Sequence, residues 1–173
     1  MKERFKFFSF LGLFFLTGSC SDQKQVFEMY KSVGSFWHKD SVVSFEFEAQ
    51  DTLTTYNLFL NLRANNEYPF SNIFLIASIE SPDGHIKKDT LEYLMASPDG
   101  KMLGNGFSDI KESKLWFKEN YRFSETGKYI FKVEQALRKR TEVEGVEKLK
   151  GISDVGLTIE LAKDNINRHN ITD

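Results

Sequence analysis

The residue whose position most clearly suggests chemistry is the single cysteine, Cys20. It directly follows three small residues, Thr17, Gly18 and Ser19, and an apolar run from Phe7 to Leu16 precedes these. Basic residues stand at positions 2, 4 and 6, ahead of the run. This order is typical of a secretory signal peptide. The apolar run is shorter than the roughly 20 residues that a membrane-spanning helix needs.

A cysteine placed directly after such small residues is the arrangement of a bacterial lipobox, in which the thiol receives a diacylglyceryl group and cleavage precedes the cysteine. Leu16 lies one position earlier than in the common form, so Thr17 occupies the usual leucine position. The alternative is an ordinary secretory signal with an incidental cysteine. We expect lipidation, because a cysteine placed at random would seldom fall at this boundary. Two or three acyl chains anchor a protein stably, so Cys20 predicts a membrane as partner.

The other reactive side chains form no catalytic or metal-binding pattern. His38, His85 and His169 are scattered, and no Gly-x-Ser-x-Gly motif is present. The sequence Gly104-Asn105-Gly106 lacks the lysine and the following helix of a phosphate-binding loop. We therefore expect no enzyme activity, no metal, no cofactor and no small-molecule substrate.

Charge gives no sign of a nucleic-acid partner. The formal net charge of the chain is −2. Removing residues 1–19 takes away three basic residues and one acidic residue, so the mature chain carries −4. A nucleic-acid-binding domain would instead carry a basic surface.

The elements that must carry these residues are predicted to be short β-strands. Apolar and polar residues alternate in several segments, and Ser81-Pro82-Asp83-Gly84 and Ser97-Pro98-Asp99-Gly100 are turn signals between two of them. The predicted strands span residues 42–49, 56–63, 72–80, 88–95, 115–123, 127–137 and 155–161. Such a series favours an all-β fold, a single antiparallel β-sandwich of jelly-roll-like type.

The domain organisation follows from these segments. Residues 1–19 are predicted to be a lipoprotein signal peptide, 20–34 a lipidated tether, 35–162 the β-sandwich domain and 163–173 a polar tail. Apolar residues at positions 26, 27, 29 and 30 leave the alternative that part of the tether docks as a first strand. The charged segment 138–150 could be a long hairpin loop or a short helix.

Aromatic residues leave one binding function open, because β-sandwiches can bind sugars on exposed rings. The candidates are Trp37, Tyr68, Tyr93, Trp116 and Tyr121. At alternating strand positions such rings are more often core residues or cross-strand partners. A surface glycan-binding lipoprotein is therefore the alternative function.

Several short motifs follow one another along the chain in an order that resembles a known family. They are Trp37-x-x-Asp40, Tyr56-Asn57, Arg63 followed by Tyr68-Pro69-Phe70-Ser71-Asn72, Asp89-Thr90-Leu91-Glu92, Gln135-Ala136-Leu137-Arg138 and Gly151-Ile152-Ser153-Asp154. Together with the lipobox, and over residues 15–162, they resemble the GldH family of gliding-motility lipoproteins from Bacteroidetes. Leu137 departs from the methionine expected there, and both residues are apolar.

The resemblance implies a non-catalytic adaptor of the envelope machinery that moves adhesins along the cell surface, a machinery tied to type IX secretion. Its partners would be other gliding or secretion proteins. The motif residues expected either to contact a partner or to support the fold are Trp37, Arg63, Tyr68, Pro69, Asn72 and Arg138. The segment 21–24 carries one acidic residue, whereas surface-exported lipoproteins of this phylum usually carry an acidic cluster there. We therefore expect an outer-membrane lipoprotein on the periplasmic face.

Three tripeptides match the Asp-Ser/Thr-apolar pattern to which Bacteroidetes attach O-glycans. They are Asp40-Ser41-Val42, Asp51-Thr52-Leu53 and Asp89-Thr90-Leu91. The alternative is that aspartate forms a turn and the hydroxyl residue leads into an apolar strand. Ser41, Thr52 and Thr90 are thus candidate O-glycosylation sites.

The Cys20→Ala substitution tests the lipid anchor. The variant should leave the membrane fraction of the native host, because it lacks the thiol that carries the acyl chains. Immunoblotting of membrane and soluble fractions measures the change, and an unchanged membrane pool would contradict the assignment.

Overall fold

Strands make up most of the protein in the computed structural model, which describes residues 25–106, 109–138 and 144–163. The strands are β1 (Gln25–Ser32), β2 (Trp37–His38), β3 (Val43–Ala49), β4 (Thr55–Ala64), β5 (Asn72–Glu80), β6 (Ile86–Leu94), β7 (Lys111–Arg122), β8 (Gly127–Gln135), β9 (Lys148–Leu149) and β10 (Ile152–Leu161). Within those ranges, no helix has the length and apolar character needed to cross a membrane.

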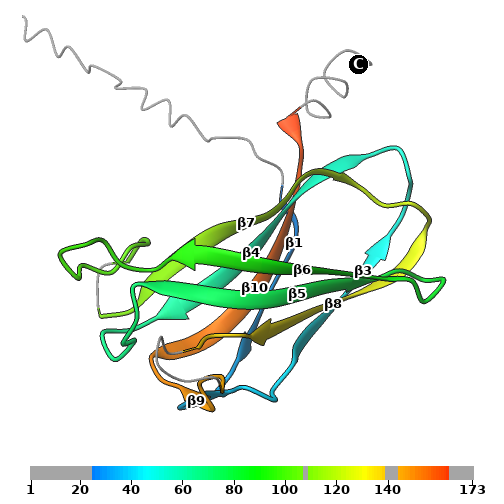
Figure 1. The fold of residues 1–173 in the computed structure, drawn as a ribbon. Helices are drawn as coiled ribbons and strands as arrows, with labels where there is room; N and C mark the ends of the chain where they lie inside the picture. Colours follow the sequence, from blue (N-terminus) through cyan, green and yellow to red (C-terminus); the bar gives the residue numbers. More distant parts are fainter. Residues whose placement is uncertain (1–24, 107–108, 139–143, 164–173) are drawn as a thin grey trace, which may run out of the picture.

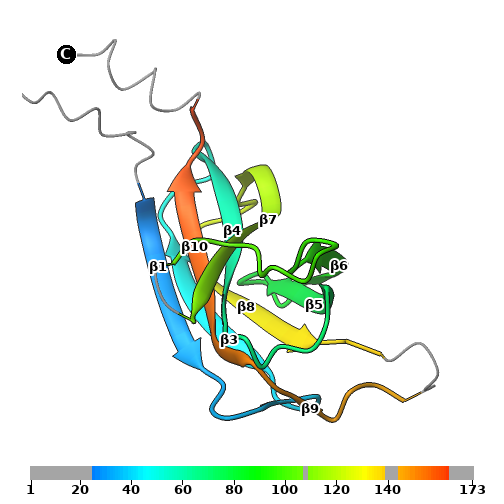
Figure 2. The same cartoon turned by 90° about the vertical axis from the view of Figure 1, so that its left-hand side faces the viewer.

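The strands form two four-stranded sheets and a small pair (Figure 1). The first sheet has the order β1-β10-β4-β7, the second has the order β3-β8-β5-β6, and β2 pairs with β9. All neighbouring strands run antiparallel. The two larger sheets stack on each other, as a view turned by 90° also shows (Figure 2). The all-β antiparallel sandwich predicted from the sequence is confirmed.

The core lies between the stacked sheets because successive strand residues point to opposite faces. In β4 of the first sheet, Leu58, Leu60 and Leu62 are fully buried. In β5 of the second sheet, Ile73 and Leu75 are fully buried as well. The alternation that predicted these strands therefore also determines which residues form the core.

An aromatic cluster closes the end of the sandwich at which β1 begins. The ring of Phe123, which is fully buried, lies 5.2 Å from Phe47, 5.4 Å from Tyr56 and 4.6 Å from Tyr129, measured between ring centroids. Phe27 of β1 packs edge-on against Phe47 at 5.7 Å. Rings from four strands and one loop thus hold both sheets together at this end.

Residues 25–32, placed in the tether with a first strand as the alternative, form strand β1. They pair along β10 from Gln25 opposite Glu160 to Ser32 opposite Asp154. The folded region therefore starts earlier than residue 35, because these backbone groups complete the edge of the first sheet. Residues 1–24, with the predicted signal peptide and Cys20, lie outside the described residues, as does 164–173 of the predicted tail.

The charged segment 138–150 contributes a strand near its end. Lys148 and Leu149 form β9, in which Leu149 pairs with Trp37 of β2. Arg138 forms an isolated bridge with Gly145. The part between them, residues 139–143, is outside the described ranges.

The turn before β10 packs directly on the loop that follows β4. Gly151 has a φ angle of +79°, and a Cβ atom added there would lie 2.2 Å from the backbone nitrogen of Tyr68. The backbone N–H of Asn65 donates a hydrogen bond of 2.8 Å to the carbonyl of Gly151. Only glycine combines this backbone conformation with so close an approach.

The Gly151→Ala substitution should therefore lower the free energy of unfolding by about 3 kcal/mol or more. Gly100→Ala is the matched control, because Gly100 has a φ angle of +82° but nothing within 4 Å of an added Cβ. The control should cost only about 1–2 kcal/mol, the backbone strain alone. Urea denaturation measures both variants, and equal losses would refute the crowding argument.

Candidate docking surface

The outer face of the first sheet carries an ordered group of polar and aromatic side chains. Strand pairing places Arg63 of β4 opposite Glu112 of β7, Asn61 opposite Lys114, and Phe59 opposite Trp116. The members are Glu28 and Tyr30 of β1, Asn57, Phe59, Asn61 and Arg63 of β4, Glu112, Lys114 and Trp116 of β7, and Asp154, Thr158 and Glu160 of β10. We call this surface the polar face.

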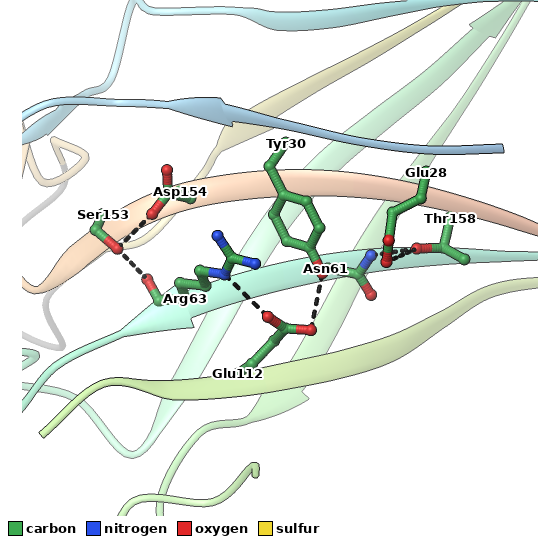
Figure 3. A network of polar contacts seen from close by, with 8 residues as sticks. All are labelled: Glu28, Tyr30, Asn61, Arg63, Glu112, Ser153, Asp154 and Thr158. Atoms are coloured by element: carbon green, nitrogen blue, oxygen red, sulfur yellow. Dashed lines mark hydrogen bonds and ion pairs between the residues drawn. The ribbon is translucent and has the colours of Figure 1, made fainter. Parts of the chain in front are cut away.

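Tyr30, Arg63 and Glu112 form the centre of one half of the polar face (Figure 3). Arg63 Nε donates a hydrogen bond of 2.9 Å to Glu112 Oε2, and the Tyr30 hydroxyl donates one of 2.8 Å to Glu112 Oε1. The guanidinium carbon of Arg63 lies 4.0 Å from the centroid of the Tyr30 ring. Each side chain is thus held by the other two, which limits their motion.

This geometry shifts the ionisation of the trio. Burial disfavours the charged form of Glu112, but the hydrogen bonds from Arg63 and Tyr30 outweigh it, so the Glu112 pKa is lowered. Burial, reinforced by the hydrogen bond to Glu112, raises the pKa of Tyr30. Near neutral pH the trio therefore holds a carboxylate, a neutral phenol and a guanidinium.

Gly156 provides the space for the Tyr30 ring. The two residues are paired across β1 and β10, and a Cβ atom on Gly156 would lie 2.8 Å from ring carbons of Tyr30. The ring therefore lies flat across β10 and reaches Glu112 on the far side of β4, as Figure 3 shows.

A chain of polar contacts, buried at Asn61 and Thr158 and exposed at Glu28, continues along the sheet beside this trio. The Asn61 amide donates a hydrogen bond to Thr158 Oγ1, and the Thr158 hydroxyl lies 3.4 Å from Glu28 Oε1, which accepts its hydrogen (Figure 3). Asn61 and Thr158 are only 1% and 2% exposed although they point away from the core. Their hydrogen bonds offset the loss of contact with water.

The other half of the polar face joins an ion pair to two aromatic rings. Lys114 Nζ contacts Glu160 Oε1 and lies 4.2 Å from the centroid of the Phe59 ring. The Phe59 ring lies 4.4 Å from Trp116 and is buried, whereas Trp116 is 51% exposed. Glu160 Oε2 is buried and has no hydrogen-bond partner among the described residues.

The arrangement suits recognition of another protein. Tyrosine, arginine and tryptophan are the residue types that most often dominate binding energy at interfaces. Here Arg63 and Tyr30 are fixed by contacts within the chain, and Trp116 presents a half-exposed ring on buried Phe59. A partner would meet a surface that is already ordered.

The structure places most of the motif residues elsewhere, close to β2 and β9. Trp37 is fully buried and donates from Nε1 to the carbonyl of Ser41 at 3.0 Å. Tyr68 is buried, and its hydroxyl donates to the carbonyl of Asn72 at 2.7 Å. The Asn72 amide donates to Glu92 at 2.7 Å. Because Trp37 and Tyr68 are buried, support of the fold suits them better than contact with a partner.

Two further motif residues are exposed near an open cleft of about 430 Å³. Pro69 and Phe70 line this cleft together with Lys39 and residues 144–150. Arg138 is exposed and bridges to Gly145, which also lines the cleft. Arg63 alone of the predicted motif residues belongs to the polar face.

The rings proposed for sugar binding do not form a common exposed platform. Trp37 and Tyr68 are buried. The Tyr93 hydroxyl donates a hydrogen bond of 2.6 Å to the backbone carbonyl of Trp116. Tyr121 packs edge-on against Phe123. Trp116 is therefore the one exposed ring of the five candidates, and this arrangement weighs against the glycan-binding alternative.

The candidate O-glycosylation residues lie in three different places. Ser41 is exposed next to β3, Thr52 is partly exposed in the β3–β4 loop, and Thr90 is exposed on edge strand β6. All three stay candidate sites. Within the ranges that the structure describes, no three histidine, cysteine or acidic side chains are grouped to bind a metal ion.

Sequence reasoning missed most of the polar face. Glu112 and Lys114 lie in a segment of mixed charge, and Glu160 alternates with apolar residues in its strand, so no single one of these residues points to a site. The available signal was the set of polar residues alternating with leucines in β4 and β10. That signal needs the strand order and register before it identifies a site, because the members come from four strands.

Comparisons with known proteins agree on one family. The model of the family described as GldH lipoprotein matches residues 25–159. A Flavobacterium johnsoniae protein named gliding motility lipoprotein GldH is 58% identical over 142 residues, covering 82% of this chain and 87% of that protein. A gliding motility lipoprotein GldH homolog of Christiangramia forsetii is 49% identical, covering 92% of this chain and 98% of its own length.

A comparison of folds with solved structures matched structures of a virus and of its particles. The crystal structure of the infectious bursal disease virus VP2 subviral particle is 12% identical, with a TM-score of 0.33. The match covers 80% of this chain and 31% of the VP2 chain.

The lowered pKa of Glu112 makes stability depend on pH in a defined direction. A carboxyl group whose pKa is lower in the folded state stabilises the fold above its unfolded value near 4.5 and stops doing so as pH falls through the folded value. The Glu112→Gln variant should therefore lose roughly 1 kcal/mol or less at pH 7. Below the pKa of Glu112 in the folded protein, the stability difference between this variant and the unmodified chain should become smaller, because Glu112 is then protonated.

Urea denaturation at pH 7 and at pH 3 measures this difference. Glu119→Gln is the control, because Glu119 is an exposed carboxylate of the same strand. A Glu112→Gln deficit that is the same at both pH values would show that the ionised form of Glu112 does not stabilise the fold.

Proposed function

Since this chain belongs to the GldH lipoprotein family, we propose that it is a lipid-anchored, non-catalytic adaptor of the gliding-motility machinery. Its anchor is the acylated Cys20, which holds the mature chain on the outer membrane. Its working surface is the polar face, which docks another envelope protein of the gliding or type IX secretion apparatus.

The observation that carries this proposal is the exposed ring of Trp116 on an otherwise ordered sheet face. Trp116 is 51% exposed, while the neighbouring Phe59 is 5% exposed and supports it from below. An exposed tryptophan beside a fixed ion pair is the kind of anchor that a protein interface buries. The hydrogen bonds of Tyr30, Arg63 and Glu112 supply polar complementarity around it.

The side of the membrane is part of the proposal. The residues that follow Cys20, Ser21-Asp22-Gln23-Lys24, contain one acidic side chain and no acidic cluster. This composition supports retention on the periplasmic face, where the partner would be a periplasmic or outer-membrane component. The tie to type IX secretion rests on the family resemblance.

The Trp116→Ala substitution in the native host tests the docking role. It should reduce colony spreading towards that of a strain lacking the gene, while the amount of the protein stays unchanged, because a half-exposed ring contributes less to folding than to an interface. Leu94→Ala is the matched control, since Leu94 is 68% exposed on edge strand β6. A strain that carries Leu94→Ala should form colonies that spread normally.

Photo-crosslinking in intact cells complements the spreading assay. A photoreactive residue at position 116 should capture an envelope protein that the same residue at position 94 does not capture. Normal spreading of the Trp116→Ala strain, together with equal capture from both positions, would refute docking through the polar face.

A further inference from the structure

The termini of the folded region meet at one end of the sandwich, which we call the anchor end. Gln25 at the start of β1 pairs with Glu160, and Leu161 at the end of β10 pairs with Tyr56. The backbone N–H of Ala162 donates a hydrogen bond of 3.0 Å to the carbonyl of Thr55. The β3–β4 loop, residues 50–54, leads into the start of β4 and therefore lies at this same end of the sandwich, with β10 between β4 and β1.

The lipid attachment point is close to this end. Five residue steps separate Cys20 from Gln25. An extended chain advances at most about 3.6 Å per residue, so the acylated residue lies within about 18 Å of the start of β1. This step rests on the proposed lipidation of Cys20.

The loop at this end presents an apolar side chain. Leu53 is 79% exposed, the largest exposed fraction among the large apolar side chains of the described residues. Both loop neighbours, Thr52 and Thr54, are uncharged. Val26 at the beginning of β1 is a further apolar side chain at this end, 42% exposed.

Hydrogen bonds hold the loop in shape. The Asp51 carboxylate accepts hydrogen bonds from the backbone N–H groups of Leu53 and Thr54, at 2.8 and 2.7 Å, and from the Thr54 hydroxyl at 2.8 Å. This is an aspartate-centred turn that satisfies the carboxylate at the base of the loop. Leu53 is thus displayed by an ordered turn.

The base of the loop is also firm. Ala49, at the end of β3, and Tyr56, near the start of β4, are both buried. The Tyr56 ring contacts Phe123 and Phe47 in the aromatic cluster at this end of the sandwich. A loop mounted on such a base cannot easily withdraw its tip into the core.

We propose that Leu53 inserts into the interfacial layer of the bilayer to which Cys20 is anchored. One leucine would bind lipid too weakly by itself, but the acyl anchor makes the contact intramolecular and raises its effective concentration. Insertion turns the anchor end towards the membrane. Strand β1 then leads away from the bilayer by up to about 26 Å to the β2–β9 end.

The test uses the lipidated full-length protein in phosphatidylethanolamine–phosphatidylglycerol vesicles. Because acylation consumes Cys20, a Thr52→Cys variant has one free thiol for an environment-sensitive dye, and it retains Leu53. The dye at position 52 should show a blue shift, a rise in emission of about twofold or more, and quenching by brominated acyl chains. The same dye in the double variant Thr52→Cys/Leu53→Gln should show none of these changes and should emit like a dye in water.

Ser35→Cys is the matched control, because Ser35 is an exposed hydroxyl residue beyond the far end of β1. A dye there should report water whether Leu53 or glutamine stands at position 53. If the labelled protein floats with the vesicles but the dye at position 52 resembles the dye at position 35, membrane contact by Leu53 is refuted and the anchor stands. If the protein does not float, the proposed anchor fails and the inference fails with it.

A second measurement uses protein from the native host. Thr52 lies in the same loop, and a glycan on it would hold Leu53 away from the bilayer. Peptide mass spectrometry should therefore find Thr52 unmodified, whatever the state of Ser41 and Thr90. A glycan on Thr52 in the bulk of the protein would overturn the proposal.

Discussion

Strand β4 is buried on both faces, and the rest of the first sheet depends on this constraint. Its inward leucines are fully buried in the core, while its outward residues Asn57, Phe59 and Asn61 are 5%, 5% and 1% exposed. A buried amide that lacks hydrogen bonds is costly. Asn57 Oδ1 accepts from the backbone N–H of Asn120 at 3.0 Å, where β7 departs from regular register with a φ angle of +49° at Asn120. The bulge in β7 thus satisfies a polar group of β4.

The same constraint explains how the polar face is ordered. With β10 and β7 fixed beside β4, Thr158 meets Asn61 and Glu112 meets Arg63. Because Gly156 has no side chain, the Tyr30 ring can lie across β10 and complete the hydrogen-bond network. These groups are positioned by the fold before any partner arrives, so binding would cost little additional side-chain entropy. This is the physical basis for treating the surface as an adaptor site.

The anchor end and the polar face together suggest how the protein is displayed. The polar face runs along strands that begin or end at the anchor end, and β1 leads from there to the β2–β9 end. A domain held by acyl chains and by one loop would therefore present this face along the side of the sandwich. The cleft near Pro69 and Gly145 would then lie further from the bilayer.

Local pattern was sufficient for much of the fold. The alternation in 56–63 and 155–161 identified both strands and their inward leucines, because side-chain direction in a strand repeats every two residues. The order of the motifs identified the family. The pattern left two alternatives for the start of the domain, because β1 lies at the edge of its sheet and only Phe27 and Tyr30 of it are partly buried.

The sequence by itself determined seven of the ten strands that the structure describes, together with the fold class, the family and the candidate anchor at Cys20. Only the tertiary structure decided that Trp37 is fully buried while Trp116 is 51% exposed, because burial depends on what packs against a ring. It also decided that Glu28, Asn61, Glu112 and Thr158 share one face. Those residues lie as many as 130 positions apart in the chain, and only the pairing of β1, β10, β4 and β7 brings them together.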